Sequence, residues 1–179
     1  MYTPQTIVII GAGEIGKGIT RGLSNGHDRV ILCDSDFEAT ESFTKKLQAQ
    51  QPAYKVEALE CSYEATWEAD IIILALSSCP DRQEIAKKIQ AVANQKIVIV
   101  ADDAREELQQ LLPHTKIIQA FGNIDPAAFD AAPENKKTIH CLVRGDDEEA
   151  VQAAAALVKT IGFHPVATLI KSSNSTTPA

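Results

Sequence analysis

The chain has 179 residues, of which 45% are hydrophobic and 23% charged, which predicts one globular domain with a core rather than a disordered chain. Its 17 Lys and Arg against 24 Asp and Glu give a formal net charge of −7, which disfavours a nucleic-acid partner. Apolar runs such as residues 71–76 are far shorter than the roughly 20 residues that span a bilayer. The first residues show no secretory signal. We therefore expect a cytoplasmic protein with no membrane segment.

Short runs rich in Val and Ile predict eight strands, at residues 6–10, 29–34, 55–59, 71–76, 97–101, 116–120, 138–143 and 165–170. The polar segments between them space apolar residues as amphipathic helices do; Ile15, Ile19 and Leu23 are the first such set. This alternation predicts a single doubly wound α/β Rossmann domain, with a mostly parallel sheet of about eight strands and helices on both faces. We expect the domain at residues 1–170, a short helix plus loop at 123–137, and a flexible tail at 171–179.

A glycine motif, Gly11-Ala12-Gly13-Glu14-Ile15-Gly16, follows the first predicted strand and opens the first helix. This strand–turn–helix placement is typical of a dinucleotide-binding site. We expect Gly11 to make the turn, Gly13 to admit a pyrophosphate to the backbone, and Gly16 to let the helix pack on the sheet. The N–H groups of the helix N-terminus would bind the phosphates. All six residues are therefore candidate cofactor-binding residues; the alternative is a Rossmann-like fold that binds no dinucleotide.

An acid ends the second predicted strand: Asp34 follows Gly11 at close to the roughly 20 residues expected in dinucleotide-binding folds. Its carboxylate can accept hydrogen bonds from ribose hydroxyls and would repel the 2′-phosphate of NADP. We therefore favour NAD(H) over NADP(H), and place Ser35 beside Asp34 in the cofactor site. The alternative is that Asp34 and Asp36 only cap the following helix.

Ligands of open α/β sheets bind outside the carboxyl ends of the strands, so the residues that follow three further strands are candidates for the nicotinamide end. We expect that end to be lined by Leu76, Ser77, Ser78, Phe121 and Gly122. The alternatives are that the serines cap the helix that begins near residue 80 and that Phe121 lies in the core.

No catalytic residue can be named from the sequence. Asp102 and Asp103 follow the fifth strand, where they would act as a base or cap a helix at 104–112. No His, Lys or Tyr lies at a strand exit in a context that indicates a general acid or base. The cofactor can supply the chemistry if the protein aligns two rings. The four cysteines and four histidines are scattered, so we expect no metal site.

These motifs resemble the N-terminal dinucleotide-binding domain shared by deazaflavin-dependent NADP oxidoreductases and pyrroline-5-carboxylate reductases. The resemblance rests on the glycine motif and on residues 69–76, 120–121, 142–147 and 161–166. It implies a nicotinamide cofactor, a deazaflavin as second cofactor, and a two-strand extension that completes the sheet. The chain departs from the deazaflavin branch in having Asp34-Ser35-Asp36 instead of a Gly-Ser-Arg-like segment, and Asp102-Asp103-Ala104 instead of an Asn-Pro turn. Gly122 also separates Ala120-Phe121 from Asn123.

Two functions follow from this pattern. The first is an NAD(P)-binding oxidoreductase that transfers hydride between the nicotinamide cofactor and a small or flat acceptor. The alternative is a non-catalytic NAD(H)-sensing regulatory or binding module, which the lack of a recognisable catalytic residue favours and the strands after residue 138 disfavour. The expected partners are the dinucleotide and an unknown small molecule. A homodimer would cover the nicotinamide end, which a single small domain leaves exposed.

Overall fold

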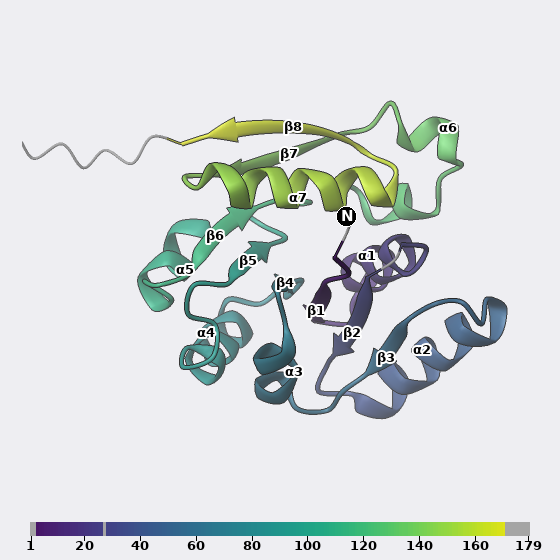
Figure 1. Cartoon of the computed structure of the whole chain (residues 1–179), viewed down its shortest axis with the longest axis horizontal. Coiled ribbons are helices and arrows are strands. Elements are labelled where there is room, and N and C mark those ends of the chain that lie inside the picture. Colours follow the sequence, from purple (N-terminus) through teal and green to yellow (C-terminus); the bar gives the residue numbers. More distant parts are fainter. Residues whose placement is uncertain (1–2, 27, 171–179) are drawn as a thin grey trace, which may run out of the picture.

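The strands form one eight-stranded sheet in the order β3-β2-β1-β4-β5-β6-β7-β8 (Figure 1). The computed structural model describes residues 3–26 and 28–170, so the predicted tail at 171–179 lies outside the described residues. The strands are β1 (Thr6–Ile10), β2 (Arg29–Cys33), β3 (Val56–Ala58), β4 (Ile71–Leu74), β5 (Ile97–Val100), β6 (Lys116–Gln119), β7 (His140–Gly145) and β8 (His164–Leu169). Neighbouring strands are parallel except β6 and β7. The predicted mostly parallel sheet is confirmed, with strand ends shifted by one or two residues.

Helices cover both faces of this sheet. They are α1 (Glu14–Ser24), α2 (Phe37–Gln50), α3 (Ser62–Glu68), α4 (Cys79–Ile89), α5 (Arg105–Leu111), α6 (Pro133–Lys136) and α7 (Glu148–Ile161), with a 3₁₀ helix at Pro126–Asp130. Side chains of α1, α2 and α7 form one core cluster, and those of α3, α4 and α5 form the other. Successive residues of β1 alternate between the two clusters, because side chains of a strand point to opposite faces in turn.

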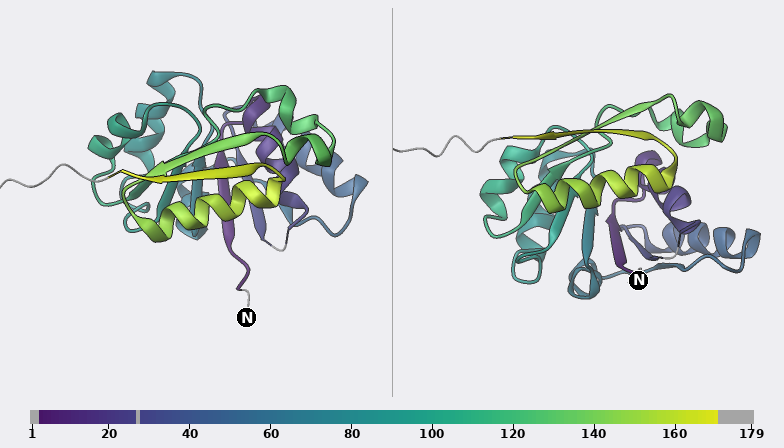
Figure 2. Two further views of the ribbon diagram at one scale, coloured as in Figure 1. Left: turned by 90° about the horizontal axis from the view of Figure 1, so that it is seen from above. Right: turned by 45° about the horizontal axis from the view of Figure 1, so that its top comes forward.

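The last two strands are less covered than the rest of the sheet: β7 is buried on one face only, and every residue of β8 is exposed or half-buried. Cys141 and Val143 of β7 are buried in the core cluster that contains α7, whereas Leu142 between them is 46% exposed. Among the described residues no helix lies over this outer face, as the view from above shows (Figure 2). The predicted helices on both faces therefore do not extend over this part of the sheet. None of the helices at 3–26 and 28–170 is both long and apolar enough to cross a membrane.

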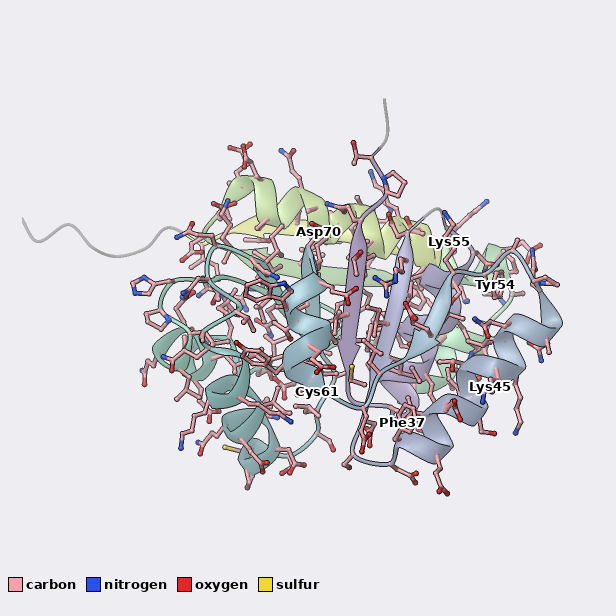
Figure 3. The ribbon with its side chains drawn as sticks, turned by 60° about the horizontal axis from the view of Figure 1, so that its bottom comes forward. Phe37, Lys45, Tyr54, Lys55, Cys61 and Asp70 are labelled. Atoms are coloured by element: carbon pink, nitrogen blue, oxygen red, sulfur yellow. The ribbon has the colours of Figure 1, made fainter. Side chains whose placement is uncertain are left out.

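The parallel strands β1 to β6 all end at the same edge of the sheet, which brings the loops after them together. In Figure 3 this edge lies in the lower part of the picture: Phe37, which begins α2, and Cys61, which precedes α3, lie near it. Asp70 and Lys55, which precede β4 and β3, lie at the opposite end of the strands. The loops that the sequence predicted to bind a ligand are therefore neighbours in space.

Candidate functional site

A cleft with a volume of about 460 Å³ lies at the carboxyl edge of β1, β2 and β4. This volume falls within the range of about 300–1,000 Å³ that is usual for cofactor and small-molecule sites. Six of the predicted residues line it: Gly11, Gly13, Asp34, Ser35, Leu76 and Ser77. The structure therefore gathers residues from three predicted loops around one cavity.

The three glycines of the motif differ in what requires them. Gly11 has φ +111°, and a Cβ there would meet the carbonyl of Ala75, so the turn itself requires glycine. A Cβ on Gly16 would meet the carbonyl oxygen of Gly11, so close packing of α1 requires glycine. Gly13 has φ −70°, and a Cβ there would meet nothing within 4 Å. Neither the backbone nor the packing of the protein requires glycine at position 13.

The N-terminus of α1 has no side-chain cap. Gly13 is its N-cap, and within the described part of the chain no side chain accepts a hydrogen bond from its first turn. The other three long helices, α2, α4 and α7, are preceded by the N-cap residues Asp36, Ser78 and Asp147, whose side chains each accept a backbone N–H. The first turn of α1 thus offers N–H donors and the positive end of a helix dipole towards the cleft. These are the properties of an anion site for phosphates.

The remaining residues of the motif do not line the cleft. Ala12 is half-buried and uses its N–H for Asp34, Ile15 packs against the core, and Glu14 is exposed.

Asp34 is held at the rim of the cleft by the loop around it. Its Oδ2 accepts the N–H of Ala12 at 2.6 Å, and its Oδ1 accepts the N–H of Asp36 at 3.1 Å and the hydroxyl of Ser35 at 3.2 Å. Burial by itself raises the pKa of Asp34, but these hydrogen bonds outweigh it, and the pKa lies below its usual value. The carboxylate is therefore charged at neutral pH. The cap of α2 is Asp36, whose carboxylate accepts the N–H of Ala39 at 3.0 Å, and not Asp34.

Several residues that line the cleft were not predicted from the sequence. They come from the loop after β3, from the start of α3 and from α4, and they are Glu60, Ser62, Asp81, Glu84, Ile85 and Lys88. The α4 members are spaced i, i+3, i+4, i+7, so one face of this helix borders the cleft. That spacing is visible in the sequence, but the sequence alone does not show that this face meets a cavity rather than solvent.

Charge in the cleft is mainly negative. Its lining contains the carboxylates of Asp34, Glu60, Asp81 and Glu84 but only one cationic side chain, that of Lys88. Cys33 also borders it, and burial raises the pKa of this thiol to about 12, so that it is neutral. Among the residues at 3–26 and 28–170, no group of three or more His, Cys, Asp or Glu side chains could hold a metal ion.

Three of the residues predicted at the nicotinamide end lie outside the cleft lining. Ser78 caps α4 by accepting the N–H of Asp81, as the alternative interpretation expected. Phe121 is only 1% exposed and has φ +66°, a conformation that side-chain-bearing residues rarely adopt. Gly122 is exposed and follows Phe121 in the loop after β6.

The two acids after β5 are both engaged by other side chains. Asp102 accepts the N–H of Ala104 at 2.9 Å and a hydrogen bond from Arg82 at 2.5 Å. Asp103 accepts a hydrogen bond from the side chain of Gln119 at 2.5 Å. Neither acid caps α5, whose N-cap is Ala104 without a side-chain hydrogen bond.

Residues 6–102, more than half of the chain, match the family described as coenzyme F420-dependent NADP oxidoreductase. The chain belongs to this family. The predicted resemblance to the deazaflavin-dependent branch is thereby confirmed, and membership places the chain among NAD(P)-dependent oxidoreductases. A comparison with curated proteins gave no match.

Solved structures support the same fold. Protein SMa0349 of Sinorhizobium meliloti is 24% identical, with a TM-score of 0.72 over 91% of this chain and 84% of that chain. A protein described as an F420-dependent NADP reductase, from Arthrobacter sp. FB24, is 15% identical, with the same TM-score and coverage. The N-terminal domain of HmdIII from Methanocaldococcus jannaschii is 16% identical, with a TM-score of 0.73 over 92% of this chain and 99% of that domain. At these identities the likeness shows the Rossmann-like fold alone.

Proposed function

We propose that this member of the family binds NAD(H), in preference to NADP(H), and transfers hydride between it and a small or flat acceptor. The observation that supports dinucleotide binding best is Gly13. Because a side chain would fit there in the free protein, the glycine is explained by a ligand that needs the space. The uncapped first turn of α1 lies at the same position and supplies donors for a diphosphate.

The dinucleotide would lie across the carboxyl edge of the sheet. Asp34, at the end of β2, would accept hydrogen bonds from the adenosine ribose, and the diphosphate would lie over Gly13. The nicotinamide half would then extend over the exit of β4, where Leu76 and Ser77 line the cleft. Bound nicotinamide supplies the hydride chemistry, and the protein's part is to bind and orient the ring.

The preference for NAD(H) rests on charge. Four carboxylates and one lysine line the cleft, and the low pKa of Asp34 keeps its carboxylate charged beside the ribose. A 2′-phosphate placed there would be repelled, since close like charges in a partly buried site are only weakly screened. The proposed preference differs from the NADP in the family's description.

Calorimetric titration of the wild-type protein with NADH and NADPH tests both parts of the proposal. We expect NADH to bind at least about tenfold more tightly, a difference of ~1.4 kcal/mol. Asp34→Arg should reverse the preference. Asp36→Ala is the matched control, because Asp36 caps α2 and does not line the cleft, so loss of the cap should lower the melting temperature and leave the preference unchanged. If neither dinucleotide binds, the proposed function is wrong; if Asp34→Arg leaves the ratio unchanged, Asp34 does not select the cofactor.

A non-catalytic NAD(H) sensor is the second candidate. It is favoured by one observation: the two acids after β5, Asp102 and Asp103, are occupied by hydrogen bonds from Arg82 and Gln119. Oxidation of NADH, followed by its absorbance with a panel of flat acceptors that includes coenzyme F420, distinguishes an enzyme from a sensor. We further propose a cytoplasmic location and a homodimer that covers the nicotinamide end of the bound cofactor. A light-scattering mass of one chain, with and without NADH, would contradict the dimer.

A further inference from the structure

Arg82 is a buried arginine next to the cleft that the proposed function does not use. It lies in the first turn of α4 and is only 9% exposed. Its Nη1 donates to the backbone carbonyl of Leu76 at 3.1 Å and to Oδ2 of Asp102 at 2.5 Å. The side chain therefore folds back from the helix onto the loops that precede and flank it.

The two acceptors lie at the exits of neighbouring strands. Leu76 follows β4 and lines the cleft, and Asp102 follows β5. The exit of β6 packs on the same point, because a Cβ on Gly122 would lie 3.2 Å from the Cα of Asp102. One guanidinium thus joins the exits of β4 and β5, and the exit of β6 rests against them. This is the half of the carboxyl edge opposite to Asp34.

Stability of the packed fold does not by itself explain why an arginine stands at position 82. The Nε of Arg82 is buried and has no hydrogen-bond partner among the described residues. Burying a charged group that is incompletely hydrogen-bonded is costly, and an apolar side chain of similar size often stabilises a fold as well or better. What the arginine provides, and an apolar residue would not, is a fixed position for the Leu76 carbonyl and the Asp102 carboxylate.

We infer that Arg82 is a positioning residue for the nicotinamide half of the dinucleotide, an inference that rests on the proposed function. By holding the backbone of Leu76, it sets the position of the lining segment Leu76-Ser77. By holding Asp102, it sets the exit of β5 and, through packing, that of β6. The adenosine half depends instead on Asp34 and the glycine loop, with which Arg82 forms no hydrogen bond within residues 3–26 and 28–170.

The test compares two ligands that share the adenosine diphosphate half. NADH carries the nicotinamide, and ADP-ribose lacks it. In Arg82→Met and in the milder Arg82→Lys, we expect affinity for NADH to fall about tenfold or more, as for the loss of one charge-assisted contact. Affinity for ADP-ribose should stay within about twofold, which also shows that the variant is folded. Where wild type turns over an acceptor, kcat should fall about 100-fold, the effect expected of a reacting group misplaced by about 1 Å.

Arg105 provides a matched control. It is also 9% exposed, its Nε donates to the carbonyl of Ile117 at 3.1 Å, and its Nη2 lies 2.9 Å from Oδ2 of Asp146. These partners lie near the amino half of β6 and beyond the end of β7, away from the cleft. Arg105→Met should leave the affinities for both NADH and ADP-ribose unchanged.

The outcomes separate this inference from the function on which it rests. If wild-type protein binds neither NADH nor ADP-ribose, both are overturned. If wild type binds both and the Arg82 variants weaken the two ligands equally, or neither, the positioning role is refuted while the proposed function stands. Asp102→Asn removes the other partner of the ion pair, and should reproduce the selective loss of NADH affinity in a weaker form.

Discussion

Gly13 offers the sharpest test of the site, because the fold tolerates a side chain at this position whereas the proposed diphosphate site does not. In Gly13→Leu, the new side chain starts at a Cβ with no heavy atom within 4 Å, on a backbone with φ −70° and ψ −173° that any residue adopts. Leucine is a poorer N-cap than glycine, which should cost about 0.5–1 kcal/mol. The variant should therefore fold, with a melting temperature only a few degrees lower, since about 2–4 °C corresponds to 1 kcal/mol at this size.

Binding should respond far more strongly. A leucine side chain at position 13 occupies the space over the first turn of α1, where the diphosphate would accept the free N–H groups. Each charge-assisted hydrogen bond to an anion contributes about 1.5–3 kcal/mol. The loss of two therefore amounts to about 3–6 kcal/mol, or at least about 100-fold in Kd.

Isothermal titration with NADH measures this effect, and differential scanning calorimetry follows stability. Gly16→Ala is the contrasting variant: its methyl group would overlap the carbonyl oxygen of Gly11, so about 1–3 kcal/mol of stability should be lost. The reasoning is refuted if Gly13→Leu binds NADH as tightly as wild type. It is also refuted if Gly13→Leu loses as much stability as Gly16→Ala, since position 13 would then be needed for the fold.

Two further predictions concern titratable groups. Because the pKa of Asp34 is lower in the folded protein than its ordinary 3.8, its contribution to stability is complete above that value and is lost as the pH falls through the lowered pKa. NADH affinity should accordingly be flat between about pH 5 and 8; a fall centred near pH 6 would show that Asp34 is not the charged group at the ribose. The thiol of exposed Cys79 should react slowly with iodoacetamide at neutral pH, because its hydrogen bond to Glu107, at 3.2 Å, raises its pKa. Glu107→Gln should speed this alkylation, measured by mass spectrometry, and an unchanged rate would contradict that cause.

Local features of the sequence were enough for the fold class and for the start of the site. The glycine motif after the first strand and the acid at the end of the second depend on backbone geometry and spacing within about 25 residues, which a sequence displays directly. Strand positions followed from apolar runs for the same reason. The antiparallel pairing of β7 with β6 and the exposed outer face of β7 and β8 were not visible, because the residues of these strands alone do not show which neighbour pairs with them.

The sequence by itself determined that a glycine turn leads from the first strand into a helix, and that a carboxylate follows at a spacing typical of dinucleotide-binding folds. Only the tertiary structure decided which of the three glycines the fold does not need, since that depends on atoms of Ala75 and Gly11 around each one. It also brought α4 to the cleft and placed Arg82 between Leu76 and Asp102. Those contacts depend on how separate strands and helices pack, and packing distances are not encoded in the spacing of residues along the chain.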